Sequence, residues 1–277
     1  LDRLEDYFQV HAFETVIRRA DWDTYPSRVE INVNYILRIL EEANTRATFF
    51  VLGWIAHHHP GLVAEIASRG HEIASHGYSH ELVYRQTPDE FEADLEGSLQ
   101  AIRSAMQGFG ASLPCSNILG YRAPSFSITR DSLWALDIIR DCGFCYDSSI
   151  FPLLAHDRYG IPDANRYSYQ VADGLWEVPV STVRLLGRNW PVAGGGYLRL
   201  YPLWLTMWSI TRINADAQPA VVYLHPWEVD PCQPKIQGAG LRSRFRHYVN
   251  LRRTGSRLRK LLERFQFGPI REVFDIV

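Results

Sequence analysis

The sequence predicts an α/β fold built on a parallel sheet that is closed, or nearly closed, into a barrel. The length of 277 residues suits one large domain, because barrels of this kind commonly span about 250 residues. Helical and strand-like patterns alternate along the chain, which is the order that parallel strands covered by helices require. Hydrophobic residues make up 46% of the chain, enough for a sizeable core.

The first half of the chain carries clear helix and strand signals in turn. Apolar residues recur at helical spacing over 28–43, and an apolar run over 47–52 predicts a buried strand. Residues 60–69 begin with proline and stop before glycine, which predicts a short helix, and a strand leading to His76 follows. Residues 88–106 form the longest helical pattern, with acidic residues early in it, where the helix dipole favours them.

The second half continues this alternation. Helices are predicted over 129–141 and 202–213, and strands over 143–147, 176–180 and 220–225. The last of these strands ends in a histidine. The sequence contains no internal repeat and no low-complexity segment, so we expect one continuous sheet rather than a solenoid.

The segment from 240 to 266 differs in composition from the rest of the chain. It holds nine Arg or Lys residues and a single acid, Glu263. Its leucines at positions 251, 258, 261 and 262 recur at helical spacing, which predicts an amphipathic basic helix. Two interpretations stay open: the helix binds an acidic polymer or a membrane surface, or it packs on the barrel with its charged face in water.

Composition narrows the class of protein. The formal net charge of −2 argues against nucleic-acid binding through overall charge. With no run of 18 apolar residues and no basic-then-apolar leader in the sequence, we expect a cytoplasmic protein without a transmembrane segment. Four scattered cysteines do not make a disulfide scaffold, and the CxxC spacing of Cys142 and Cys145 straddles a predicted helix end, which favours a structural role for reduced thiols.

The most informative local motif is the segment Ser75-His76-Gly77-Tyr78-Ser79-His80. Its two imidazoles are four positions apart, and this spacing lets both rings face one metal ion. The nearby run of histidines at 57–59 precedes Pro60 and is better explained as a solvated helix end. From these residues alone, a metal site and a pair of surface histidines are equally good explanations of the motif.

Other chemically capable residues also follow predicted strands. Each is ordinary by itself, but the carboxyl ends of barrel strands converge on one mouth, so these side chains would meet the histidine pair there. They are Glu5, Asp6, Arg122, Asp147 and His225.

Five motifs, in order, resemble those of the NodB-like polysaccharide deacetylases, carbohydrate esterase family 4. They are the segment 75–80, Arg122-Ala123-Pro124, Tyr146-Asp147-Ser148-Ser149, Trp176-Glu177-Val178-Pro179 and Leu224-His225-Pro226-Trp227-Glu228. Segments 5–10, 194–199 and 245–251 resemble the subgroup found with exosortase (PEP-CTERM) and exopolysaccharide loci, which carries an extra C-terminal segment. The resemblance implies a distorted (β/α) barrel of the NodB-homology type over residues 1–238 and a helical basic extension over residues 239–277.

The resemblance also implies a divalent metal, commonly zinc, held by one acid and two histidines. His76 and His80 match the two imidazole ligands, and the donor set suits zinc with a position left open for water and substrate. Arg122 matches the arginine that orients the catalytic base, and its guanidinium fork suits a carboxylate. His225 matches the general acid, and Asp147 its carboxylate partner.

Further positions match the substrate pocket of the family. The backbone N–H of Ser125 corresponds to the donor that stabilises the oxyanion, and relatives often have tyrosine at this position. Trp176 and Leu224 would wall the acetyl pocket. Candidates for stacking on sugar rings are Trp190, Tyr197, Tyr201 and Trp227.

The N-terminal motif departs from the family pattern. The family expects a first aspartate as catalytic base, and Arg3 stands where the subgroup usually has it. Three assignments are open. Glu5 is the base and Asp6 the metal ligand; or Glu5 is the ligand and the base is missing; or Asp2 fills the gap through a bulge. The first matches the adjacent acid pair of most relatives and is the one we adopt.

We therefore expect a metal-dependent hydrolase that removes N-acetyl groups from amino sugars of a polysaccharide. Two alternatives remain open. One is a metal-independent amidase of the allantoinase type on the same fold, although such relatives should lack the paired metal histidines. The other is a catalytically impaired carbohydrate-binding or scaffold relative that kept His76 and His80 and lost its base.

Overall fold

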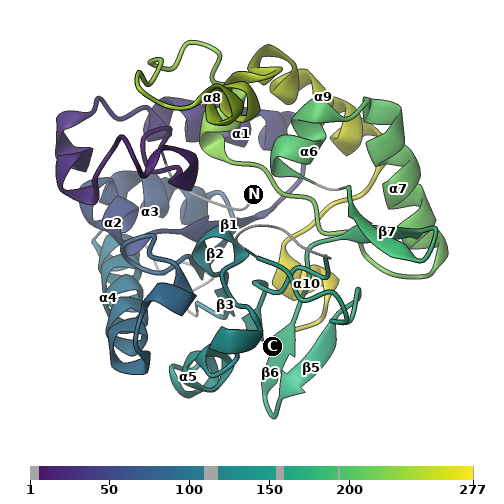
Figure 1. Ribbon diagram of the computed structural model, residues 1–277, viewed down its shortest axis with the longest axis horizontal. Helices are drawn as coiled ribbons and strands as arrows, with labels where there is room; N and C mark the ends of the chain where they lie inside the picture. The colour runs from purple at the N-terminus through teal and green to yellow at the C-terminus, as the bar shows by residue number, and fades with distance from the viewer. Residues whose placement is uncertain (1–5, 109–117, 154–158, 193, 277) are drawn as a thin grey trace.

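A parallel sheet forms the centre of the computed structural model, which describes residues 6–108, 118–153, 159–192 and 194–276 (Figure 1). Its strands lie in the order β1-β2-β3-β4-β6-β5. All neighbours pair in parallel except β5, which is antiparallel to β6. The bounds are β1 (Thr48–Val51), β2 (Glu72–Ser75), β3 (Gly120–Tyr121), β4 (Tyr146–Asp147), β5 (Tyr169–Ala172) and β6 (Leu175–Glu177). The predicted α/β class is confirmed.

Helices surround this sheet in chain order, with α2 to α5 on one side of the view and α6, α7 and α9 on the other (Figure 1). Those of the first half are α1 (Val29–Glu42), α2 (Gly53–His58), α3 (Pro60–Ser68), α4 (Pro88–Gln107) and α5 (Ala135–Asp141). Those of the second half are α6 (Gly195–Leu200), α7 (Leu203–Ala215), α8 (Leu241–Tyr248), α9 (Leu251–Arg264) and α10 (Ile270–Val273). Strands β7 (Thr182–Leu185) and β8 (Arg188–Pro191) form a separate antiparallel hairpin.

The long helix α4 shows how local sequence sets a helix boundary. Thr87 caps its first turn and Glu90 returns a side-chain bond to the backbone of Thr87, so the two residues form a capping box. Pro88 occupies the first turn, where its missing N–H costs nothing. The predicted helix over 88–106 is therefore confirmed to within a residue.

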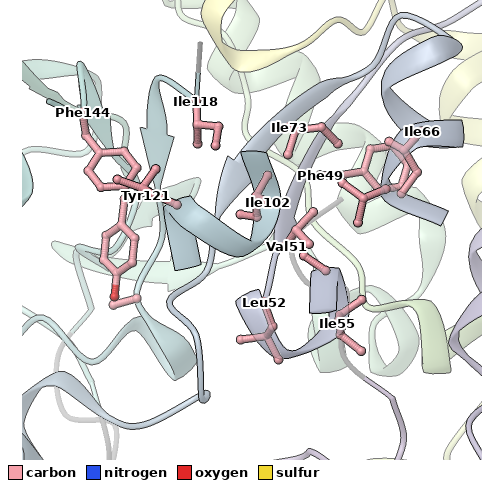
Figure 2. Close-up of a cluster of buried hydrophobic side chains, with 14 of the residues drawn as sticks. Phe49, Val51, Leu52, Ile55, Ile66, Ile73, Ile102, Ile118, Tyr121 and Phe144 are labelled. Atoms are coloured by element: carbon pink, nitrogen blue, oxygen red, sulfur yellow. The ribbon is translucent and has the colours of Figure 1, made fainter. Parts of the chain in front are cut away.

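The central strands are buried on both faces because their side chains alternate between two cores. Phe49 and Val51 point outward and pack with Ile55, Ile66 and Ile102 of the covering helices (Figure 2). Phe50 points inward, into a cluster with Ala74, Tyr146 and Val178 that also contains Ile270 and Ile276 from the chain's last residues. Residues near the C-terminus therefore pack against the inner face of the sheet.

Two predicted elements differ from the structure. Residues 220–225 do not form a ladder strand but only an isolated bridge between Tyr223 and Gly194. The Tyr223 carbonyl accepts from the Gly195 N–H at the start of α6 at 2.9 Å, and the Val221 N–H donates to Ser181 Oγ at 2.7 Å. The basic segment is two helices rather than one, because Asn250, with φ of 55°, turns the chain between α8 and α9. Among the described residues, no helix is both long enough and apolar enough to span a bilayer.

Candidate active site

The two histidines of the segment 75–80 lie on the loop that follows β2, and both are buried. Their ring centroids are 5.3 Å apart and the rings are inclined at 60°. His76 Nδ1 lies against the Arg122 carbonyl oxygen. Since a carbonyl only accepts, Nδ1 carries the proton, and the lone pair of His76 is on Nε2. This is the tautomer in which a histidine binds a metal through Nε2.

Asp94 of α4 fixes the loop that carries this pair. Its carboxylate accepts from the Tyr78 N–H at 2.7 Å, the Ser79 N–H at 3.1 Å and the Ser79 hydroxyl at 2.7 Å. Gly77, with φ of 74°, passes so close that a Cβ there would lie 2.6 Å from the Asp94 carboxylate. The glycine is required for this approach, and Asp94 is a site residue that the sequence prediction missed.

A third imidazole joins the pair from the N-terminal segment. The His11 ring stacks on His80 with centroids 4.6 Å apart, and His11 Nδ1 lies 3.0 Å from Glu14 Oε2. His11 and His80 line one cavity of about 250 Å³. The sequence prediction did not include His11, because no ligand spacing connects it to His76.

Asp6, predicted as the metal's carboxylate ligand, accepts four hydrogen bonds, three of them at the start of α1. Its carboxylate accepts from the Tyr7 N–H at 2.9 Å, Ser27 Oγ at 2.6 Å, the Arg28 N–H at 2.5 Å and the Val29 N–H at 3.1 Å. Burial raises the pKa of Asp6, while these bonds act to lower it. The described residues contain no group of three or more His, Cys, Asp or Glu side chains placed to hold one metal ion. Asp2, Arg3 and Glu5 lie outside the described residues.

Arg122 follows β3, and its side chain is buried in the interior of the sheet. Its Nε donates to the Ser148 carbonyl at 2.8 Å, and Nη2 donates to Ser148 Oγ at 2.5 Å. The guanidinium lies over the Phe50 ring at 4.3 Å. Arg122 and Leu224 both line a cavity of about 150 Å³, which places the predicted acetyl-pocket residue Leu224 on the same side of the sheet as Arg122.

Asp147 has other partners than the predicted His225. It takes the position opposite Glu177 in the β4–β6 register, and its carboxylate accepts hydrogen bonds from the Ser149 hydroxyl and from the Glu177 carboxyl. Burial raises the pKa of Asp147 and raises that of Glu177 further, so Glu177 is the protonated member of the pair. The physical reason is strand alternation: Tyr146 points into the inner cluster, so Asp147 points to the outer side, as Tyr121 does.

His225 instead meets a carboxylate three residues further along the chain. It precedes the short helix η6 (Pro226–Val229), and its Nδ1 lies 3.1 Å from Glu228 Oε2. Arg199 Nε donates to the other oxygen of Glu228 at 2.7 Å, and both side chains are buried. Although burial raises it, the charges of Arg199 and His225 bring the pKa of Glu228 down to about 2. Glu228 is therefore a fixed anion beside His225.

The aromatic residues predicted to bind substrate differ in how exposed they are. Trp227 is only 4% exposed, with one ring neighbour in His225 at 5.3 Å and another in His247 at 4.1 Å, so it supports His225 and offers no face to a sugar. Trp176 and Trp190 are 41% and 47% exposed. Tyr197 pairs with Tyr201, with ring centroids 5.8 Å apart.

The backbone at Ser125 is in an uncommon conformation. Ser125 and Phe126 both have positive φ, at 53° and 55°, in a buried turn after Pro124. Consecutive non-glycine residues in the left-handed region store strain and are typical of functional turns. The turn lies close to Arg122 in the sequence and contains Ser125, whose N–H is the predicted oxyanion donor.

Two family models match parts of this chain. One, described as polysaccharide deacetylase, matches residues 21–144. These residues are similar to that family. A second model, described as a domain of unknown function (DUF3473), matches residues 148–275. The histidine pair lies in the deacetylase match and His225 lies in the second one.

Named deacetylases share short segments with this chain. Identity is 43% over 60 residues with a peptidoglycan-N-acetylglucosamine deacetylase from Bacillus cereus, covering 22% of this chain and 22% of that protein. It is 37% over 70 residues with a chitooligosaccharide deacetylase from Rhizobium leguminosarum bv. trifolii, covering 25% and 33%. The chain spans a third or less of the length of these relatives.

Two solved structures share the fold. A protein from Mycobacterium smegmatis, assigned as a polysaccharide deacetylase, has a TM-score of 0.63 at 20% identity, covering 99% of this chain and 87% of the other. Puue allantoinase has a TM-score of 0.56 at 13% identity, covering 87% and 70%. These similarities establish the distorted-barrel architecture. They do not establish the reaction, which has to be inferred from the residues of the site.

Proposed function

We propose that the chain is a metal-dependent hydrolase that removes N-acetyl groups from amino-sugar residues of a polysaccharide. The observation that carries the proposal is the buried pair His76 and His80, with His76 Nδ1 bonded to a carbonyl so that Nε2 presents its lone pair. The family model that matches residues 21–144 and the names of the relatives support the N-acetylated substrate.

The residues present fit a zinc ion in part. His76 and His80 would hold it, and a carboxylate would complete the set. When bound, zinc supplies a Lewis acid that polarises the acetyl carbonyl and makes water acidic enough to attack. Three of the four hydrogen bonds that the Asp6 carboxylate accepts come from Ser27, Arg28 and Val29 at the start of α1. This favours Glu5 over Asp6 as the ligand, and the hydrolase would then take its base from Asp2, as in the third assignment.

The chain's own side chains then have distinct tasks. His225, with Nδ1 held by Glu228, delivers the proton from Nε2 to the leaving amine. The Ser125 N–H stabilises the oxyanion, and Leu224 walls the acetyl group. Arg122 would orient the base, as the family resemblance implies. We further propose an acetylated exopolysaccharide as substrate, on the subgroup resemblance of segments 5–10, 194–199 and 245–251.

A second candidate function follows from the same Asp6 observation. If Glu5 is the metal ligand and Arg3 occupies the position of the usual base, the chain binds acetylated carbohydrate without hydrolysing it. The hydrogen bonds of Asp6 are the specific observation in its favour. Because they occupy the Asp6 carboxylate, Glu5 has to bind the metal and cannot act as the base.

One experiment separates these functions. Metal content is measured on the purified protein, and acetate release is followed with N-acetylated chitooligosaccharides and exopolysaccharide. The hydrolase is expected to bind about one zinc per chain and release acetate, and His76→Ala should abolish both. His57→Ala, at an exposed histidine outside the site, is the matched control and should change neither. Bound metal with no acetate released from any substrate would establish the binding protein; hydrolysis without metal would establish the allantoinase type.

A further inference from the structure

Helix α8 presents apolar and cationic side chains together to solvent. Leu241 and Phe245, one helical turn apart, are 83% and 62% exposed. Arg242, Arg244 and Arg246 flank them and are also exposed. None of these three arginines has an ion-pair partner among the described residues. This eight-residue helix thus exposes two large apolar side chains and three charged side chains that have no such partner among the described residues.

The opposite side of α8 is firmly attached to the domain. His247 is buried, its Nε2 lies 2.6 Å from Gln233 Oε1, and its ring stacks on Trp227 at 4.1 Å. Arg199 donates to the His247 carbonyl at 2.8 Å. Figure 1 shows α8 at the periphery of the molecule. The exposed face is therefore rigidly presented and has no role in holding α8 in place.

Helix α9 adds charge but no exposed apolar residues. Leu251, Leu258 and Leu261 are buried, so its apolar stripe packs on the domain as one of the two sequence interpretations expected. Its outer side carries Arg252, Arg253, Lys260 and Arg264, all exposed and without ion pairs among the described residues. Arg259, in contrast, pairs with Glu42 at 3.1 Å. Both helices therefore expose cationic side chains on a chain whose net charge is −2.

We propose that α8, with the cationic side of α9, is a docking surface for an anionic lipid bilayer. Arginines would face the anionic headgroups, and Leu241 and Phe245 would enter the boundary between headgroups and acyl chains. An acidic polysaccharide would use the same charges and can stack on the Phe245 ring, but it gains little from Leu241, the more exposed of the two side chains, which has no flat face. The apolar pair on α8 therefore decides in favour of lipid. This proposal is independent of the reaction at His76 and His80.

Vesicle sedimentation tests the proposal. The full chain is mixed with vesicles of phosphatidylcholine alone or with 30% phosphatidylglycerol added, at low salt and at 0.5 M salt. We expect binding to the anionic vesicles only, and its loss at high salt. Arg242→Gln/Arg244→Gln/Arg246→Gln should weaken binding on the order of a hundredfold. Leu241→Ser/Phe245→Ser should weaken it about tenfold or more.

Control variants remove the same number of charges, or the same number of exposed apolar side chains, elsewhere on the protein. Arg103→Gln/Arg184→Gln/Arg188→Gln changes three exposed arginines outside α8, and Ile31→Ser/Leu133→Ser changes two exposed apolar residues. Both should bind as the wild type does. Failure of the wild-type protein to bind anionic vesicles overturns the proposal. Vesicle binding that is unchanged in Leu241→Ser/Phe245→Ser also overturns it. If that variant and the wild type both bind a soluble polyanion as well as they bind vesicles, the surface is a site for an acidic polymer instead.

Discussion

Glu228 carries a negative charge inside the protein, between the Arg199 guanidinium and the His225 ring. Its pKa of about 2 in the folded chain lies below the ordinary value of 4.5. A carboxyl with a lowered folded pKa stabilises the fold above its unfolded pKa, and this contribution is lost as pH falls from about 4.5 toward 2. Asp6, Glu72, Asp147 and Glu177 act in the opposite sense, because their raised pKa values favour folding as they take up protons.

Replacing Glu228 by Gln should isolate this contribution. At pH 7 the variant leaves Arg199 buried beside a neutral amide, and we expect a loss of about 3 kcal/mol in the free energy of unfolding. At pH 2.5 the difference from wild type should be much smaller, because this pH is close to the folded-state pKa of about 2 and the ionised carboxyl then contributes little to stability. Urea unfolding at both pH values measures it. Glu263→Gln, at an exposed acid of α9, is the control and should change stability at neither pH.

The neighbours of His225 also show where residue-level prediction works and where it stops. The sequence places His225 correctly at a segment end next to Leu224, because a motif carries its own local geometry. It pairs His225 with Asp147, but β4 has only two residues in the ladder, and the side chain of its second residue points outward. His11, Asp94 and Arg199 reach the site through contacts between distant segments, which no local pattern encodes.

At the scale of elements, the loop after β2 depends on α4. Asp94 accepts three hydrogen bonds from Tyr78 and Ser79 with its two oxygens, and these orient the segment between the two histidines. Asp94→Asn keeps the size but has one acceptor oxygen fewer. We expect zinc affinity to fall about 10- to 100-fold, as for other residues that orient metal ligands. Competition with a zinc chelator measures this, and Glu92→Gln, exposed on the same helix, should leave the affinity unchanged.

The start of α1 offers a second test at this scale. Asp6 accepts from the Arg28 and Val29 N–H groups, as a capping residue does, but from a distant position in the sequence. Asp6→Ala should lower the free energy of unfolding by about 1–3 kcal/mol, because buried donors lose their acceptor. Zinc binding, measured on the same sample, should persist. If Asp6→Ala lost zinc while its free energy of unfolding stayed unchanged, Asp6 would instead be the metal ligand. Asp23→Ala, at an exposed acid, is the control.

At the scale of the whole molecule, alternation of helices and strands was enough to predict the class of fold and most helix bounds. It was not enough to predict how the sheet is completed. Residues 220–225 have the apolar run of a strand, yet they make their hydrogen bonds to Ser181 and Gly195 rather than to a neighbouring strand. The interior beside them is filled by residues from the end of the chain, and sequence patterns give no information on such long-range packing.

Helix α10, near the C-terminus, is hydrogen-bonded to the first two strands of the sheet. The Ile270 N–H donates to Thr48 Oγ1 at 2.8 Å and the Arg271 N–H donates to Glu72 Oε2 at 3.3 Å, which joins α10 to the first residues of β1 and β2. Ile270 packs with Phe50 inside the sheet. Because this cluster belongs to the common core, Ile270→Ala should cost about 2–4 kcal/mol in one cooperative unfolding transition. Val273→Ala changes a 42% exposed residue of the same helix and should cost far less. A separate early transition in Ile270→Ala, with the main one unchanged, would show instead that the C-terminal residues are a detachable appendage.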